Sequence, residues 1–154
     1  MAPGKRSPSG TTGADIFQHC VMTRARQISR VLTAPYEQAL RPFGINATQF
    51  TLLVLVHELG PISRADLGRR NHHDRSTLTR NLRPLLTEGW ITEDVAEAAD
   101  GRSRPLSVTR AGKLVLKDAG PAWAEAQAMA TALIGDDGVA AIMGVAKRLP
   151  KQAG

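Results

Sequence analysis

The sequence predicts a mainly α-helical fold with one small β-hairpin, and three observations support this prediction. Apolar residues recur three and four positions apart along most of the chain, as they do on one face of an α-helix. Residues that commonly cap helices, such as Asn46, Ser63 and Asp74, stand before several of these stretches. Strand-like alternation is confined to residues 91–108. The 154 residues are enough for one domain with a core of its own.

The N-terminal part of the chain divides into an arm and a long helix. Residues 1–13 are rich in glycine, serine, threonine and proline, so we expect a disordered arm. Asp15–Leu40 carries apolar residues at intervals of about seven, with Asp15 as the cap and Pro35 as the position of a kink or break. A small domain cannot cover so long an apolar stripe, and a second subunit is the expected cover.

A helix-turn-helix is predicted next. The most apolar segment, Asn46–Leu59, contains a run that alone would suit a buried strand, but Asn46 and Gln49 have the spacing of a capping box and predict a helix. Ser63–Arg70 is expected to form a short helix, and Asn71–His73 a turn into the following helix. Two helices joined by such a turn form a helix-turn-helix.

The second of these helices, Asp74–Trp90, is the candidate recognition helix. Asp74 is its expected cap and Gly89 its expected end. Its apolar stripe consists of Leu78, Leu82, Leu85 and Leu86. The rest of the surface carries arginine and hydroxyl groups that suit phosphates and base edges, namely Arg75, Ser76, Thr77, Thr79, Arg80 and Arg83. A capped helix that is merely solvated is the alternative for this segment taken alone.

A β-hairpin is predicted directly after this helix. Ile91 and Val95 indicate one strand, Leu106 and Val108 another, and Asp100-Gly101 a turn between them. A hairpin in this position turns the helix-turn-helix into a winged helix. Arg102 and Arg104 follow the turn, where cationic side chains suit the negative potential of a narrow minor groove.

Two helices are expected to complete the chain. They are Thr109–Ile134, with Thr109 as its cap and a kink or break at Pro121, and Asp136–Leu149. Their small, apolar faces suit helix–helix packing, so both chain ends are assigned to a dimer interface. The predicted organisation is an arm (1–13), an N-terminal dimerisation helix (14–45), a winged helix-turn-helix lobe that binds DNA (46–109) and C-terminal dimerisation helices (110–150).

Composition excludes several other classes of protein. The formal net charge of +6 suits nucleic acid, whereas aromatic residues make up only 4%, too few for a platform that stacks single-stranded bases. A single cysteine excludes an internal disulfide and cysteine-rich zinc sites. No apolar run approaches the ~20 residues of a membrane span, and no secretion signal is evident, so we expect a cytoplasmic protein without a membrane partner. Because no catalytic motif organises the Ser, His and Asp residues, we expect neither an enzyme nor a cofactor.

Four segments together resemble the MarR family of bacterial transcription regulators. They are DRSTLTRNLRPL (Asp74–Leu85) with the GW-I pattern behind it, DGRSRP (Asp100–Pro105), SVTRAGK (Ser107–Lys113), and Tyr36–Ile45 after the Arg26…Arg30 pair. The resemblance covers residues 15–149. It departs from the family pattern at Asn71–His73, where an apolar residue, a glycine and another apolar residue are usual, and this departure is expected to weaken the packing between the two helices.

The resemblance implies a symmetric homodimer that docks two lobes on a palindromic double-stranded operator and represses transcription. It also implies release by a small phenolic or aromatic effector, or by oxidation. By position it also implies DNA contacts from Ser76, Thr77, Thr79, Arg80 and Arg83, and from Arg102 and Arg104 on the wing, with Asp100 orienting the wing. A constitutive winged-helix protein that binds DNA or a partner without any ligand remains the alternative.

Three other sites are weighed against simpler readings. Cys20 is a candidate redox thiol, because His19 and Arg24 lie near it, or else a small core residue. His57 is a candidate ligand contact or a core histidine. His72 and His73 resemble metal ligands, but adjacent histidines in a turn seldom converge on one ion, so no metal is predicted.

Overall fold

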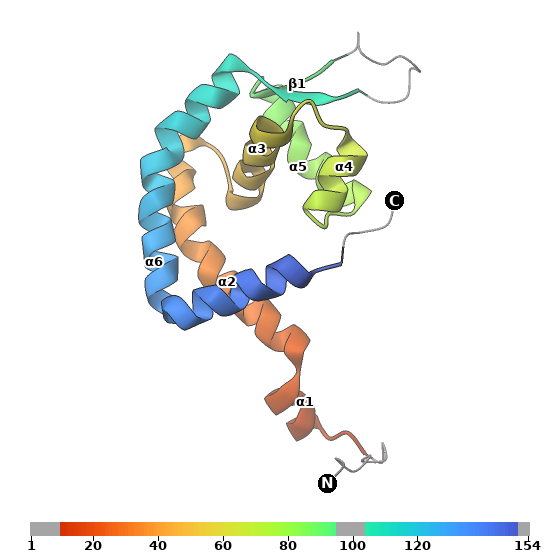
Figure 1. Cartoon of the computed structure of the whole chain (residues 1–154), viewed down its shortest axis with the longest axis vertical. Coiled ribbons are helices and arrows are strands. Elements are labelled where there is room, and N and C mark those ends of the chain that lie inside the picture. The colour runs from red at the N-terminus through yellow and green to blue at the C-terminus, as the bar shows by residue number, and fades with distance from the viewer. Residues whose placement is uncertain (1–9, 95–103, 151–154) are drawn as a thin grey trace.

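The computed structural model describes residues 10–94 and 104–150, and most of them are helical (Figure 1). The elements follow in the order α1 (Gly13–His19), α2 (Val21–Leu40), η1 (Arg41–Phe43), α3 (Ala47–Leu59), α4 (Arg64–Arg70), α5 (Arg75–Thr87), β1 (Ile91–Glu93), β2 (Leu106–Val108) and α6 (Arg110–Arg148). The predicted mainly α fold with a small β-wing is confirmed.

Helix α3 lies at the centre of the core, between the long helices and the helix-turn-helix (Figure 1). Leu52, Leu53 and Val56 are fully buried, together with Leu67 of α4 and Leu106 of β2. The predicted capping box starts this helix: the Asn46 side chain accepts the Gln49 N–H, and the Gln49 side chain accepts the Asn46 N–H. Helix α3, with its capping box, is therefore the central element against which the surrounding helices and β2 pack.

The wing is an antiparallel pair of strands in which Ile91 faces Val108 and Glu93 faces Leu106. Ile62 adds a single bridge: its N–H donates to the Leu106 carbonyl at 3.1 Å and its carbonyl accepts the Leu106 N–H at 2.8 Å. The root of the hairpin is thus fixed to the chain just before α4. Val95 and the predicted turn Asp100-Gly101 lie outside the described residues.

The prediction of one helix over Asp15–Leu40 is wrong at its start. Helix α1 ends at His19, and Cys20, in an extended conformation, separates it from α2. The cap is Thr12, whose hydroxyl accepts the Asp15 N–H at 3.2 Å, while Asp15 supplies the other half of a capping box. Pro35 does not split α2. At the break, the Cys20 sulfur accepts the Thr23 N–H and caps α2.

Helix α6 bends at Gly135, which is the boundary between the two predicted helices Thr109–Ile134 and Asp136–Leu149, and not at Pro121, where a further kink or break was expected. Gly135 has φ 68° and ψ 173°, and no other residue inside α6 departs from helical angles, so a break at Pro121 is ruled out. Glycine adopts a left-handed conformation easily, and α6 keeps helical angles at Pro121 although a proline removes one helical hydrogen bond and crowds the preceding turn. Helices α2 and α6 lie side by side, and α6 after Gly135 turns across the lower part of the molecule (Figure 1).

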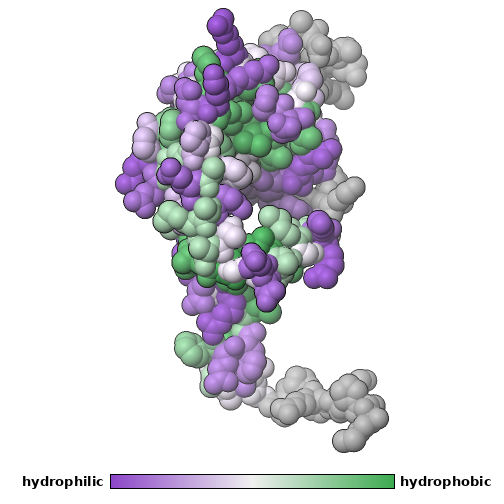
Figure 2. Space-filling view, turned by 60° about the vertical axis from the view of Figure 1, so that its left-hand side comes forward, coloured by the Kyte–Doolittle hydropathy of each residue, from purple (hydrophilic) through white to green (hydrophobic). Residues whose placement is uncertain are grey.

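Large apolar side chains are exposed along α1, α2 and α6. Figure 2 shows apolar surface in the lower half of the molecule, where these helices lie. Exposed fractions reach 75% for Phe17, 80% for Val21 and 59% for Leu133. Among the described helices, α6 is long and apolar enough to cross a membrane, judged by length and composition only. Its apolar residues do not form one uninterrupted run in the sequence.

Candidate nucleic-acid interface

Helix α5 starts at a strong cap. One carboxylate oxygen of Asp74 accepts the Thr77 N–H at 2.8 Å, and the other accepts the Thr77 hydroxyl at 2.7 Å. The hydroxyl of Thr77 and then its backbone N–H lower the pKa of Asp74, so the carboxyl stays charged at the positive end of the helix. The prediction of Asp74 as cap is confirmed. Its partner Thr77, predicted as a DNA contact, uses its hydroxyl proton inside the cap.

The two faces of α5 differ sharply. Leu78, Leu82 and Leu85 are buried against α3 and α4, as the apolar stripe predicted. An open groove of about 560 Å³ runs along the other face. It is lined by five of the six predicted contact residues on this helix, namely Arg75, Ser76, Thr79, Arg80 and Arg83. The structure therefore brings these five side chains together on one accessible surface.

The side chains of this groove suit a polyanion whose bases present hydrogen-bonding groups and methyl groups. Arg75, Arg80 and Arg83 are exposed and form no ion pair with any residue that the structure describes. The Thr79 hydroxyl donates to the Arg75 carbonyl at 2.8 Å, so its proton is used within the helix while the exposed side chain lines the groove. Guanidinium forks pair with phosphate or guanine, and threonine methyls contact thymine.

The turn before α5 adopts a backbone conformation that is usual for glycine. His72 has φ 51°, and it is the one non-glycine residue among those described that has a positive φ. The His73 N–H donates to the Gly68 carbonyl at 3.0 Å, and buried Gly68 leaves little room beside the His73 carbonyl and the Leu78 side chain. The unusual turn thus keeps α4 and α5 in close contact, and its cost is backbone strain at one histidine.

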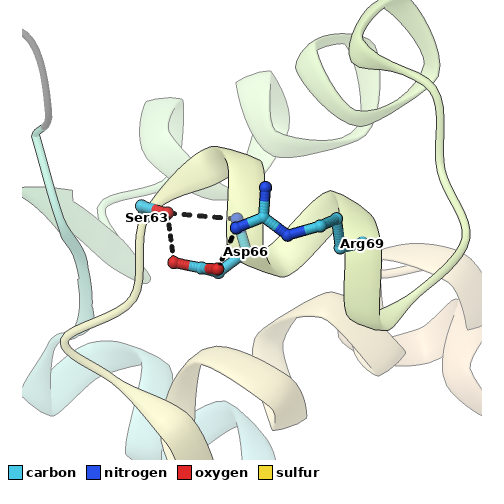
Figure 3. Close-up of polar contacts among 3 residues, drawn as sticks. All are labelled: Ser63, Asp66 and Arg69. Atoms are coloured by element: carbon cyan, nitrogen blue, oxygen red, sulfur yellow. Dashed lines mark hydrogen bonds and ion pairs between the residues drawn. The ribbon is translucent and has the colours of Figure 1, made fainter. Parts of the chain in front are cut away.

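An arginine that was not considered in the sequence, Arg69, pairs with an acidic residue in the first turn of α4. Ser63 caps the helix by accepting the Asp66 N–H at 3.0 Å and donates its hydroxyl to the Asp66 carboxylate at 2.7 Å (Figure 3). Arg69 forms an ion pair with the other carboxylate oxygen. The Ser63 hydroxyl and then Arg69 lower the pKa of Asp66. Arg69 is therefore neutralised within α4, unlike the arginines of α5.

The wing is tied to α4 by an ion pair. The Arg64 guanidinium donates from Nε and Nη2 to one oxygen of Glu93 at the end of β1, both at 2.5 Å. Arg104 is exposed beside β2, whereas Arg102 and Asp100 lie outside the described residues. Sequence reasoning missed the Arg64–Glu93 pair because 29 positions separate the two residues.

The remaining candidates lie away from α5. His57 is exposed at the end of α3, near Glu58 at 3.8 Å, so its interpretation as a core histidine is wrong. Cys20 is half-buried, and its sulfur accepts the Thr23 N–H at 3.5 Å; contacts from Thr23 lower its pKa. Within the described ranges, no group of three His, Cys, Asp or Glu side chains is arranged to hold a metal.

Comparison with known proteins places this geometry in a family. The family model described as "MarR family" matches residues 45–93. The transcriptional regulator MosR of M. tuberculosis, solved in complex with DNA, has 31% identity and a TM-score of 0.72, covering 85% of this chain and 100% of that one. A probable transcriptional regulator from Pseudomonas aeruginosa has 25% identity and a TM-score of 0.75, covering 87% and 99%.

More distant comparisons agree on the fold. A MarR variant from E. coli, complexed with operator DNA, has 20% identity and a TM-score of 0.76, covering 90% of this chain and 100% of that one. A curated Bacillus subtilis relative, the uncharacterised HTH-type transcriptional regulator YwoH, is 24% identical over 84 residues, which are 54% of this chain and 60% of that protein. The chain thus belongs to the MarR family of DNA-binding transcriptional regulators and is not an enzyme.

Proposed function

We propose that this protein is a cytoplasmic, homodimeric repressor that places α5 of each subunit in the major groove of a palindromic operator. The observation that carries the proposal is the open groove of α5, in which Arg75, Arg80 and Arg83 stand beside Ser76 and Thr79 without an acidic partner among the described residues. The capped N-terminus of α5 and its buried leucine stripe hold this surface rigidly. Arg104, just before β2, is exposed and adds a cation on the wing.

The comparisons support DNA as the partner. The MosR structure is a complex with DNA, and the E. coli MarR variant is complexed with operator DNA. The same docking here would give base contacts from Ser76, Thr79, Arg80 and Arg83, phosphate contacts from Arg75, and flanking contacts from Arg102 and Arg104. Thr77 contributes by holding the first turn of α5 through Asp74.

Exposed apolar surface at both chain ends supports a homodimer. Phe17, Val21, Met129, Leu133 and Met143 are each more than half exposed, and they lie on α1, α2 and α6. Large apolar patches on a water-soluble surface indicate a protein interface, and a symmetric pair of chains is the most frequent solution. Such a dimer presents two α5 helices, so its operator contains two half-sites about 34–36 Å apart.

The decisive experiment combines DNA binding with measurement of mass. Fluorescence anisotropy on a duplex from the protein's own upstream region, with excess random duplex as competitor, should show specific binding that weakens as salt rises. Light scattering after size exclusion should give twice the chain mass. A reporter behind that region should fall when the protein is expressed. A monomer, binding equal to that of random DNA, or a reporter that rises would contradict the proposal.

We infer release by a small aromatic effector between α2 and α6. Tyr36 on α2 donates its hydroxyl to Gln127 on α6, and both residues are half-buried. Burial raises the pKa of Tyr36, so the phenol remains a neutral donor at physiological pH. A phenol–amide pair between apolar helices offers polar groups to a ligand. A panel of aromatic acids should weaken operator binding of the wild type but not of Gln127→Leu; no response to any compound favours the constitutive alternative.

Control through Cys20 is a second candidate, and its half-buried thiol with a lowered pKa favours it. A thiolate at the start of α2 is the reactive form toward peroxide. Oxidation would add bulk where the sulfur accepts the Thr23 N–H. Peroxide should then reduce operator binding of the wild type and leave Cys20→Ser unaffected; equal responses of the two proteins would exclude the thiol switch.

A further inference from the structure

The end of α5 meets the start of α6 at four residues, Gly89, Trp90, Thr109 and Gly112, which we call the α5–α6 joint. The Thr109 N–H donates to the Trp90 carbonyl at 3.0 Å, and the Thr109 hydroxyl lies 2.6 Å from the Gly89 carbonyl oxygen and 3.1 Å from that of Trp90. These contacts connect the helix that carries the DNA-facing groove directly to the longest helix of the chain. No role is assigned to them by the docking of α5 on DNA.

On the α5 side, the joint is a rigid extension of the helix. The Trp90 N–H donates to the Leu85 carbonyl at 2.9 Å, and the Gly89 N–H donates to the Leu86 carbonyl at 3.1 Å. Gly89 has φ 67°, so the pattern is a Schellman motif. The carbonyls of Gly89 and Trp90 therefore keep a fixed direction relative to α5.

On the α6 side, the Thr109 hydroxyl makes two kinds of bond at once. Its oxygen accepts the Gly112 N–H at 3.1 Å and so caps α6, while its proton is donated to the Gly89 and Trp90 carbonyls. A hydroxyl combines both functions in a single oxygen atom. A carboxylate caps a helix equally well but has no proton to donate. Capping of α6 alone therefore does not explain why this position carries a hydroxyl side chain.

Gly112 lets the start of α6 approach the Trp90 carbonyl more closely than any other residue would allow. A Cβ atom built on Gly112 would lie 2.1 Å from the Trp90 carbonyl oxygen and 2.9 Å from a methyl carbon of Val108. The residue is buried. Because these neighbours are backbone and a packed side chain, a larger residue must move α6 relative to α5.

We propose that the α5–α6 joint fixes the direction of the recognition helix relative to the dimer, with Thr109 and Gly112 as positioning residues that set the half-site spacing that the protein accepts. This inference rests on the proposed dimer and on α5 as its DNA-reading helix. From Arg110 to Ile134, α6 is about 37 Å long at ~1.5 Å per residue. A rotation of about 5° at the joint shifts the far end by about 3 Å, close to the ~3.4 Å rise of one base pair.

The test compares Thr109→Asp with Thr109→Ser, and Gly112→Ala with Gly120→Ala, in the full-length protein. Thr109→Asp keeps the cap but places a negative charge against two carbonyl oxygens, whereas Thr109→Ser keeps both bonds. Gly112→Ala favours the helix but collides with Trp90, whereas a Cβ at Gly120 meets nothing within 4 Å. Binding is measured on a single half-site duplex and on duplexes whose two half-sites are moved apart or together by one and two base pairs.

We expect Thr109→Asp and Gly112→Ala to lose about tenfold in affinity at the wild-type spacing, or about 1.4 kcal/mol, and to prefer a different spacing. Their affinity for the single half-site should stay at the wild-type value, and Thr109→Ser and Gly120→Ala should follow the wild type throughout. An unchanged spacing profile, or an equal loss on every duplex that tracks a loss of thermal stability, would overturn the proposal. If Thr109→Asp does not fold, Gly112→Ala decides. If the wild-type protein binds DNA without any sequence preference, that result contradicts the proposed function and not the role of the joint.

Discussion

At the scale of single residues, some polar side chains form hydrogen bonds or ion pairs at the ends of helices and stabilise the fold. Others have no such partner among the described residues and face outward. Thr77 donates its hydroxyl to the Asp74 carboxylate at the start of α5, and Arg69 is paired with Asp66 on α4. Arg80 has no such partner among the described residues and lines the open groove. Identical residue types in one lobe therefore have different functions, and local pairing decides which is which.

Replacing Arg80 tests base readout at this scale. We expect Arg80→Ala to reduce discrimination at one base position of the operator by about 1–3 kcal/mol, because a guanidinium fork pairs with one guanine. The matched control is Arg69→Ala, which removes the same charge from a residue already paired within α4. Competition binding with operators mutated at each position would measure both. Equal losses at all positions for Arg80→Ala would show a phosphate contact instead.

His72 provides a prediction about stability. Its left-handed backbone suits glycine, so His72→Gly should raise the free energy of unfolding by about 0.5–1 kcal/mol, after the added freedom of the unfolded glycine is counted. His73→Gly is the matched control and should lower it, because His73 has no positive φ. Urea unfolding monitored by circular dichroism measures both. A loss of stability in His72→Gly would show that the imidazole contributes more than its backbone costs.

At the scale of elements, long-range side-chain pairs determine how the wing sits on the helix-turn-helix. Arg64 and Glu93 are partly exposed, at 36% and 22%, and together with the Ile62–Leu106 bridge they fix the root of the hairpin to the start of α4. The position of Arg104, the described cation of the wing, depends on this root.

Exchanging the charges of that pair tests its contribution. We expect Arg64→Glu and Glu93→Arg each to destabilise the protein, and the double exchange to recover about 0.5–1 kcal/mol of the summed loss, as partly exposed ion pairs do. Urea unfolding of the four proteins gives the coupling energy. Operator binding at low salt should recover in parallel. A coupling energy of zero would mean that the β-bridge alone holds the wing.

The sequence predicted elements whose signals are local. The caps at Asn46, Ser63, Asp74 and Thr109 follow from neighbouring residues, so four helix starts and the face of α5 could be read directly. The break at Cys20 could not, because a cysteine that caps a helix is unusual.

Contacts between distant residues could not be predicted from the sequence, because no local pattern indicates them. Tyr36 and Gln127 are 91 positions apart, and Arg64 and Glu93 are 29 apart. The joint at Thr109 looked like a simple cap, because the carbonyls that it holds come from the end of another helix. Local patterns give the candidate site, whereas its positioning depends on packing that only the fold defines.

At the scale of the whole molecule, apolar surface that this single chain leaves exposed connects DNA binding to assembly. Helices α2 and α6 pack against each other, while Phe17, Val21 and Leu133 on α1, α2 and α6 remain exposed. If a second copy covers them, the two α5 helices act together on one operator. Affinity then depends on residues that never touch DNA.

A charge in this apolar surface tests that dependence. Leu133 is 59% exposed on α6, so Leu133→Glu should leave the subunit folded but prevent association, since a carboxylate cannot be buried unpaired in an interface. Operator affinity should fall by roughly 10²–10⁴-fold, the usual gain from joining two binding sites, while binding to a single half-site is retained. Leu59→Glu, at a 37% exposed position on α3, should change neither quantity. Light scattering and anisotropy give the mass and the affinity, and a Leu133→Glu protein that stays dimeric would remove α6 from the interface.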